Sequence, residues 1–271
     1  MNKIHEIQEN PLKSVFLLSI PIIAILFLHT FYSVVDAFWI AQLGEKAVIA
    51  VGYVLNLWYI VQKLGEGIGR SCNVLILMDF GADEYEEANN IACHGLMVIL
   101  ALSVIIPIMF FLFIKPICIL GHLERYSTLI AEYFAIPSVF IVFVLLTNYF
   151  AAILGSEGDT KRASVIVIIG NVINIILDPI LIYEFDLGIF GAGIATTIGC
   201  LVSFLLFYYL YYVRHDVVIE LSKVHFRYDV KILKEILRIS IPLVLNGFIL
   251  AILGLMINYS LHIFSNPVMS F

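Results

Sequence analysis

Long apolar segments, separated by short stretches of charge, glycine or proline, fill almost the whole chain of 271 residues. We place seven of them near residues 14–40, 47–78, 91–114, 129–154, 163–184, 189–213 and 236–263. A helix needs about 20 apolar residues to cross the hydrocarbon core of a bilayer, and every one of these segments is long enough. Lipid offers the backbone no hydrogen bonds, so such segments must satisfy their own polar groups, as helices do. The sequence therefore predicts an all-α, polytopic membrane helical bundle.

The composition agrees with this fold class and excludes several others. Hydrophobic residues make up 62% of the chain and charged residues 13%, whereas soluble domains carry about 25% charge. The first ten residues are polar and the apolar run after them is too long for a signal peptide. The four cysteines have no metal-type spacing, and no basic face is present to bind nucleic acid.

The distribution of lysine and arginine predicts the orientation in the cell membrane. Loops on the side of the N-terminus hold eleven of these residues and the opposite loops hold three. Positive charge favours the cytoplasmic side, so we expect a cytoplasmic N-terminus. The basic connection after the sixth segment is expected either to lie on the membrane surface or to be a solvated linker.

A short repeat indicates how the chain is organised. LKSVFLLSIP (12–21) recurs as LKEILRISIP (233–242), with five identities in ten positions. Repeats in secondary transporters frame a substrate site between two halves. We therefore expect a six-helix N-terminal lobe (1–213), a cytoplasmic linker (214–235) and the first helix of an incomplete second lobe (236–271), as in a truncated twelve-helix protein.

Two carboxylates, Asp36 and Asp178, lie inside apolar segments. Ionisable groups at membrane depth are costly and mark ion, proton or substrate paths by default. Each lies eight residues from its outer boundary, as Thr196 does in the sixth segment, so all three are about 12 Å deep. Asn174 lies one turn deeper on the same face as Asp178. The alternative is an acid at the headgroup level, or one paired for packing alone.

These four side chains together predict a cation-binding or proton-exchange site. Two carboxylates, an amide and a hydroxyl would form an all-oxygen cage that suits a hard ion such as Na⁺. Two like-charged acids also favour protonation of one of them, so H⁺ is the other candidate. We expect no cofactor beyond this coupling ion.

Other polar residues in the apolar segments are weaker candidates. Tyr32 and His29 share a helical stripe with Asp36, and Asn148 is a candidate lining residue in the fourth segment. Lys63, Glu66 and Arg70 fall on one stripe of the second segment, either as a second polar site or as a self-paired group. We interpret the run DFGADEYEEANN as a solvated acidic turn.

The order of several motifs resembles the multidrug and toxic compound extrusion (MATE) family. They are the Pro21…Asp36…Gly44 pattern, FGADEYEEA, LGSEGDTKRAS, GNVINIILDPILIYEFDLGIFGAGIATTIG and ISIPLVLNG, which together cover nearly the whole chain. The resemblance implies a two-lobe antiporter in which Na⁺ or H⁺ entry drives export of amphipathic, often cationic compounds. It assigns cation coupling to Asp36, Asn174, Asp178 and Thr196, lumen positions to Tyr32 and Asn148, and a helix kink to Pro21. Lys63, Glu66 and Arg70 depart from the family pattern.

Three other functions remain open on the sequence. A lipid-linked oligosaccharide flippase of the same superfamily would carry more basic residues in its cavity than Lys63 and Arg70. An intramembrane aspartyl protease would need sequence contexts that Asp36 and Asp178 lack. A half-length chain would be inert, or would pair with a partner half or with a second copy in the lipid bilayer.

Overall fold

The computed structural model describes residues 20, 23, 27, 30–32, 34–120, 127, 128, 130, 131, 138–222 and 224–265. In these ranges the regular structure is helical. The α-helices are α3 (Glu45–Gly81), α4 (Tyr85–Leu120), α6 (Ile141–Ser156), α7 (Thr160–Pro179), α8 (Gly188–Tyr208) and α9 (Val230–Ser265). Two π-helical turns, η2 (Ile180–Glu184) and η3 (Tyr209–Arg214), continue α7 and α8. Residues 34–41 form a helical segment ahead of α3.

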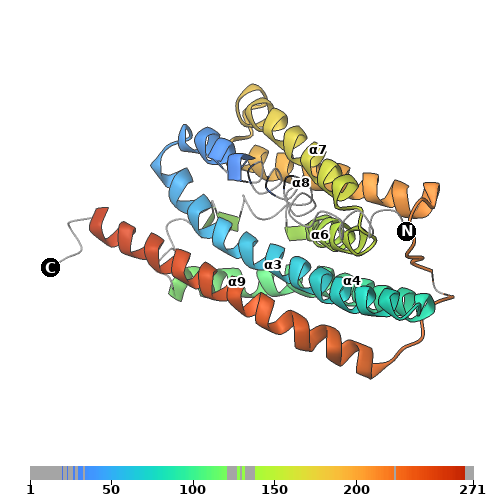
Figure 1. The fold of residues 1–271 in the computed structure, drawn as a ribbon. Helices are drawn as coiled ribbons and strands as arrows, with labels where there is room; N and C mark the ends of the chain where they lie inside the picture. Colours follow the sequence, from blue (N-terminus) through green and yellow to red (C-terminus); the bar gives the residue numbers. More distant parts are fainter. Residues whose placement is uncertain are drawn as a thin grey trace.

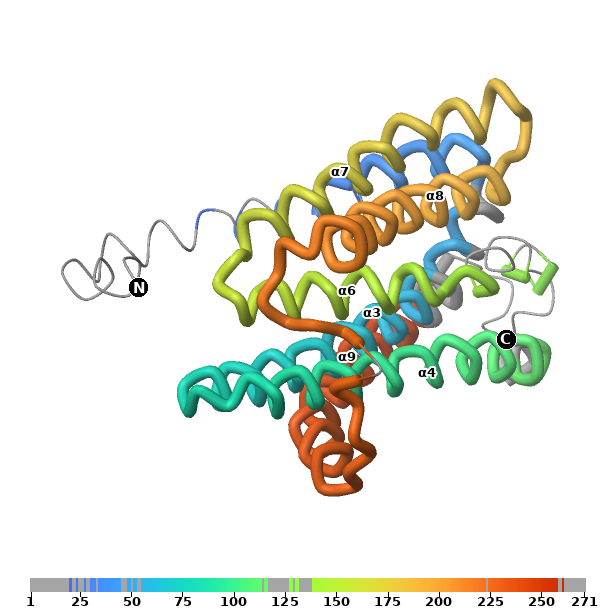
Figure 2. The backbone as a smooth tube through the Cα atoms, turned by 90° about the vertical axis from the view of Figure 1, so that its right-hand side faces the viewer, coloured from blue at the N-terminus to red at the C-terminus, as the bar shows by residue number. Residues whose placement is uncertain are grey.

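Helix α6 lies between two groups of helices (Figures 1 and 2). α7 and α8 pack against each other on one side, and α3, α4 and α9 lie on the other. Tyr149 and Phe150 of α6 are at most 2% exposed. The hydroxyl of Tyr149 donates to the carbonyl of Ala92 in α4, while the Phe150 ring packs against Phe207 of α8. These large side chains therefore join the two groups through the middle of the bundle.

Glycines on α9 set how closely this helix lies against α3. A Cβ on Gly247 would be 2.5 Å from Cγ of Lys63, and one on Gly254 would be 2.1 Å from Oδ1 of Asn56. Along α9 the contact with Lys63 comes before the contact with Asn56, whereas along α3 Asn56 comes before Lys63. Helix α9 therefore runs antiparallel to α3 (Figure 1). Lys63 and Asn56 thus pack over positions that have no side chain.

The outer surface of the bundle is apolar. Four stretches of the described helices are long and apolar enough to cross a membrane: Tyr85–Phe113, Thr160–Glu184, Gly188–Arg214 and Val230–Ile257. On α4, Val104, Ile108 and Leu112 form an exposed row at a spacing of four residues. Such a row is stable against lipid and unfavourable in water. The predicted polytopic helical bundle is confirmed.

The connection between α8 and α9 lies across one end of the bundle, which we call the linker end. This end also holds the α3–α4 turn (82–84) and the α6–α7 turn (157–159). The described residues from His215 to Asp229 form bends and turns, and Ile219 is fully buried. The linker is therefore docked on the bundle through Ile219, while most of its other described side chains are exposed. The final residues of the stretch expected as linker, from Val230, belong to α9.

Candidate functional site

Two glycines bring α7 and α8 into backbone contact beside the predicted cation site. A Cβ on Gly199 would lie 2.6 Å from the carbonyl oxygen of Gly170, and one on Gly170 would lie 2.5 Å from that of Gly199. Close by, Nδ2 of Asn174 donates to Oγ1 of Thr196 across 3.3 Å. The absence of side chains at the crossing allows these two polar residues to meet.

Asp178 is fully buried at the end of α7 and is followed by Pro179. Proline has no backbone N–H, so it interrupts the hydrogen-bond ladder of the helix. The chain then continues as the wider π-helical turn η2. Such π-turns inside helices are frequent at functional sites.

Residues 34–41 are attached beside η2 through Trp39. The hydroxyl of Tyr183 donates to the carbonyl oxygen of Trp39 across 2.6 Å, and their ring centroids lie 5.9 Å apart. On this segment Asp36 is 2% exposed and close enough to Asp178 for the two carboxyls to interact electrostatically. The attachment therefore brings the carboxylates from two distant segments together.

Tyr32 joins the same group of residues. Its side chain is hydrogen-bonded to Thr196 and interacts electrostatically with both Asp36 and Asp178. We call Asp36, Asn174, Asp178 and Thr196 the acid cluster, with Tyr32 beside it. The structure thus places the four predicted cation ligands together, while their role in coupling stays a prediction.

Several oxygen atoms of the acid cluster are buried without a hydrogen-bond partner among the described residues. They are Oδ1 of Asp36, Oδ1 of Asn174 and both carboxyl oxygens of Asp178. A buried polar atom left unpaired costs about 1–3 kcal/mol, and more when it is charged. An Na⁺ ion suits such oxygen donors, and a proton on one carboxyl relieves the same penalty. The donor set therefore fits either coupling ion.

The remaining predicted site residues lie elsewhere or outside the described part of the chain. Asn148 faces α3, where its Cβ is 3.4 Å from the position of a Cβ on Gly65. His29 and Pro21 lie outside the described residues. Their predicted roles as lumen residue and helix kink stay predictions.

The charged stripe of α3 is paired within itself. Nζ of Lys63 lies 2.6 Å from Oε2 of Glu66, and Nη2 of Arg70 lies 2.5 Å from Oε1 of the same carboxylate. The ammonium of Lys63 also lies 5.2 Å from the ring centroid of Tyr59. The sequence left open whether this stripe forms a second polar site or pairs within itself, and the structure shows the pairing.

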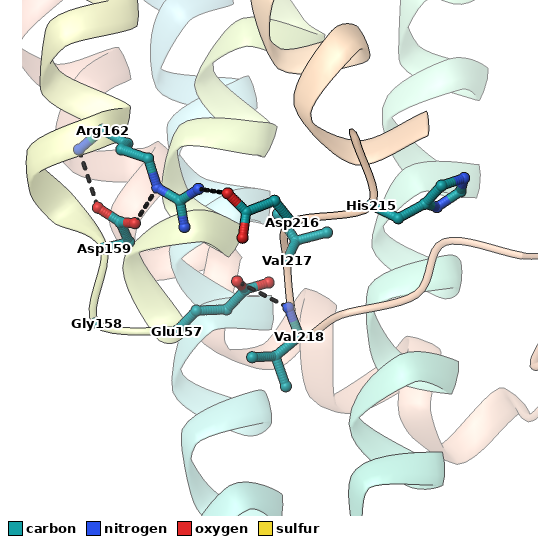
Figure 3. Close-up of a pocket in the computed structure, with 8 residues that line it drawn as sticks. All are labelled: Glu157, Gly158, Asp159, Arg162, His215, Asp216, Val217 and Val218. Atoms are coloured by element: carbon teal, nitrogen blue, oxygen red, sulfur yellow. Dashed lines mark hydrogen bonds and ion pairs between the residues drawn. The ribbon is translucent and has the colours of Figure 1, made fainter. Parts of the chain in front are cut away.

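At the linker end, side chains of the lobe capture backbone N–H groups of the linker. The carboxylate of Glu157 accepts from Val218 and Ile219, both at 3.0 Å (Figure 3 shows the Val218 contact). Burial raises the pKa of Glu157, although these two hydrogen bonds act in the opposite direction. Glu157 thus attaches the linker to the α6–α7 turn.

Three residues of α4 hold the rest of the linker. Oδ1 of Asn89 accepts from Glu220 N at 2.9 Å, and Oδ1 of Asn90 accepts from Arg227 N at 3.0 Å. Nε2 of His94 accepts from Asp229 N at 2.9 Å. We call Asn89, Asn90, His94 and Glu157 the linker clamp.

Arg162 adds an ion pair to this attachment. Its guanidinium bonds Asp159 at the start of α7, and its Nη1 lies 2.9 Å from Oδ2 of Asp216 in the linker (Figure 3). The residues surround an open pocket of about 350 Å³ at the surface. Because these charged groups are already paired with each other, we assign the pocket a structural role.

Sequence reasoning missed the linker clamp and one residue near the acid cluster. In the run DFGADEYEEANN, residues 81–87 are exposed as expected, but the run enters α4 at Tyr85 and its last two residues, Asn89 and Asn90, are buried, so the interpretation as a solvated turn is wrong there. The spacing of Asn90 and His94 places them on one face of α4 but does not indicate that they bind backbone N–H groups of the linker. Asn171 shares a stripe with Asn174 and Asp178, and its buried Nδ2 has no hydrogen-bond partner among the described residues.

Long apolar helices around buried carboxyl groups define the class of this chain as a polytopic helical membrane protein. The model of the MatE family matches residues 21–180, and the chain belongs to that family.

Relatives and solved structures agree with this assignment. "Multidrug export protein MepA" of Staphylococcus aureus is 26% identical over 260 residues, which cover 94% of this chain and 56% of the relative. MepA of Staphylococcus saprophyticus is 26% identical over 257 residues, covering 92% of this chain and 55% of the relative. The chain thus spans about half the length of the curated relatives it matches.

Two solved structures show the same fold. One is described as an inward-facing multidrug resistance MATE family transporter of the MOP superfamily, with a TM-score of 0.81, 29% identity and coverage of 85% of this chain and 52% of that one. The other is a MOP superfamily transporter from Pyrococcus furiosus whose description reports reverse polarity of its binding pocket. It has a TM-score of 0.80, 31% identity and coverage of 85% and 51%.

Proposed function

We propose that this chain supplies the cation-coupling lobe of an antiporter that exports amphipathic or cationic compounds across the cell membrane. The N-terminus and the linker end lie on the cytoplasmic side in this proposal, following the distribution of lysine and arginine. The chain acts as a secondary transporter and not as an enzyme. The names of the MepA relatives support export of drugs or toxins as the activity.

The unpaired oxygens of Asp36, Asn174 and Asp178 are the single observation that carries this proposal. Their burial is unfavourable in the absence of a cation, and Na⁺ or H⁺ at this point relieves it. An ion drives transport only when it binds two conformations with different affinity. Asp36 and Asp178 come from segments far apart in the chain, so their separation changes when those segments move. Ion binding would thus favour the conformation in which the two carboxyls are close.

A second lobe completes the transporter in this proposal. It comes from a longer form of the same polypeptide, from a partner half or from a second copy of this chain. α9 lies along α3 and resembles the start of the first lobe in sequence, so it marks where the second lobe joins. The substrate site then lies between the lobes.

Two other functions fit the described residues less well. A flippase for lipid-linked oligosaccharides must neutralise a pyrophosphate, whereas Lys63 and Arg70 share one carboxylate and leave a single net positive charge. An aspartyl protease needs water and a peptide at its dyad, whereas Asp36 and Asp178 are at most 2% exposed.

The test compares Asp36→Asn with Asp186→Asn. Asp186 is exposed at the loop after η2, and its positive φ of 53° is tolerated by asparagine, so it serves as the matched control. Binding of ²²Na⁺ and release of protons are measured on the purified chain. Export of a fluorescent dye is measured in cells that produce the complete transporter containing this chain.

The proposal expects Asp36→Asn to abolish ion binding and dye export at unchanged protein level, and Asp186→Asn to leave both intact. Retained export by Asp36→Asn would overturn the assignment of the acid cluster. Binding of Na⁺ without proton release would identify Na⁺ as the coupling ion, and the reverse result would identify H⁺.

A further inference from the structure

Lys63, Glu66 and Arg70 form an ionic group in the middle of the longest helix described. Both oxygens of Glu66 are engaged, one by each cation, so the three side chains together carry one net positive charge. Lys63 is the central residue of α3 (Glu45–Gly81) and lies about 27 Å from either end. The sequence predicts that segment 47–78 crosses the membrane, and a charged group in the middle of such a segment faces protein or a water-filled cavity rather than lipid.

The neighbours of α3 place this group on a particular side of the helix. α9 covers one flank, where Gly247 contacts the stem of Lys63 and Val244 contacts Gly67. α6 covers the other flank, where Asn148 and Ala152 approach Gly65 and Gly69. The charged stripe lies between these flanks, and its side chains are 28%, 31% and 64% exposed for Lys63, Glu66 and Arg70. It therefore faces outward from α3, between α6 of the first lobe and α9.

The free hydrogen-bonding capacity of this group lies on its cations. A guanidinium has five N–H donors in a planar fork, and Glu66 engages Arg70 through Nη2. Arg70 is the most exposed of the three, so the rest of its fork is available to a planar acidic group. The Tyr59 ring lies one turn before Lys63 and offers an apolar surface beside the ammonium.

We propose that this face of α3 binds the acidic group of an amphipathic substrate, with Arg70 as the main contact and Lys63 as the second. This inference rests on the proposed export function and narrows its substrate class to compounds that carry a carboxylate or sulfonate, including zwitterions. The single net positive charge of Lys63, Glu66 and Arg70 attracts one negatively charged group of a substrate. It repels a substrate that carries only positive charge.

The experiment uses two dyes that share one ring system and differ in charge. Rhodamine 6G is a cationic ethyl ester. Rhodamine 19 is the corresponding free acid, so it carries a carboxylate where rhodamine 6G carries the ester. Binding to the complete transporter that contains this chain, held in lipid nanodiscs, is followed by fluorescence polarisation at equilibrium. A charge-assisted hydrogen bond contributes roughly tenfold or more in affinity, so we expect the acid to bind at least about tenfold tighter.

Three variants and a control separate the contributions. Arg70→Gln and Lys63→Gln should remove most of the preference for the acid, and Glu66→Gln should increase it because the group then carries two positive charges. Arg238→Gln, an exposed arginine near the start of α9, should change nothing. Equal affinity for the two dyes, or an unchanged preference in Arg70→Gln, would overturn the inference.

The measurement needs no ion gradient, so it separates this inference from the proposed coupling site. If Asp36→Asn keeps the preference for the acid while export is lost, both proposals stand. If Asp36→Asn leaves export intact while Arg70→Gln loses the preference, the coupling assignment fails and the substrate assignment stands.

Discussion

The backbone N–H of Asp229 donates to Nε2 of His94 across 2.9 Å, and this contact fixes the last residue before α9 on helix α4. Nδ1 of the same ring lies 2.9 Å from the carbonyl oxygen of Asn90 and therefore carries the hydrogen. The buried ring is thus neutral in one tautomer, with both nitrogens in use.

Replacement of His94 tests this contact. His94→Phe keeps a ring of similar size but leaves the Asp229 N–H without its partner, which costs about 1–3 kcal/mol. His94→Gln offers Oε1 near the position of Nε2 and should restore much of the loss. Hydrogen exchange at the Asp229 amide measures both effects, with the exposed His215→Asn as control. Equal exchange in the Phe and Gln variants would show that His94 acts by packing alone.

The second prediction concerns pH and His225 in the linker. Hydrogen bonds to Glu86 of α4 and to Glu220 raise the pKa of His225 above its usual 6.5. A group with a raised pKa stabilises the folded state fully below its unfolded pKa and loses that contribution as pH rises through the folded value. The linker should therefore detach more readily as pH rises from about 6.5.

Trypsin cleavage after Arg227 measures this detachment. The cleavage rate of the natural chain is divided by the rate of His225→Gln at the same pH, which removes the pH dependence of the protease itself. This ratio should rise with pH, because only the natural chain loses the charged His225. A constant ratio would show that His225 does not hold the linker.

The third prediction concerns the glycine crossing that supports the acid cluster. A Cβ in Gly199→Ala would lie 2.6 Å from the Gly170 carbonyl oxygen and 3.1 Å from Cβ of Asn174, so α7 and α8 must separate. We expect a loss of about 1–3 kcal/mol and a weaker ²²Na⁺ or proton affinity. Thermal unfolding and ion binding are compared with Gly81→Ala, where a Cβ meets open space. An unchanged ion affinity would separate the crossing from the site.

The fourth prediction concerns the stability cost of the acid cluster. Asp178→Asn removes a buried carboxyl whose two oxygens lack hydrogen-bond partners among the described residues, so its melting temperature without Na⁺ should rise. In the natural chain, Na⁺ at about 100 times its Kd should add roughly 2.7 kcal/mol if it binds, and this gain should disappear in the variant. Asp186→Asn is the control. A lower melting temperature for Asp178→Asn would mean that the carboxyl is stabilising.

The helical membrane fold and the membership of the acid cluster were predictable because their sequence signals are local. Apolar length alone predicts membrane helices, and counting residues from the loops gives Asp36, Asp178 and Thr196 a common depth. The contact of Asn174 with Thr196 follows from that depth only because Gly170 and Gly199 let the helices touch. The order of the helices around α6 depends on side-chain packing over long sequence separations, which no local pattern contains.

The linker clamp was not predictable for a different reason. Its acceptors are side chains, but its donors are backbone N–H groups, which every residue except proline carries. The sequence of the linker therefore gives no sign of where it docks. The pairing of Glu66 with both Lys63 and Arg70 was foreseeable from spacing, whereas the position of the stripe between α6 and α9 required the packing of both helices.

Because the clamp ends at Asp229 and α9 begins at the next residue, α9 has a fixed fulcrum on the first lobe. A helix of 36 residues is about 54 Å long, so a tilt of about 10° at that fulcrum moves its far end by roughly 9 Å. Lys63 and Asn56 of α3 pack directly over the glycines at 247 and 254, so such a tilt would shift both contacts. A small rotation at the linker end would thus become a wide opening at the other face of the membrane.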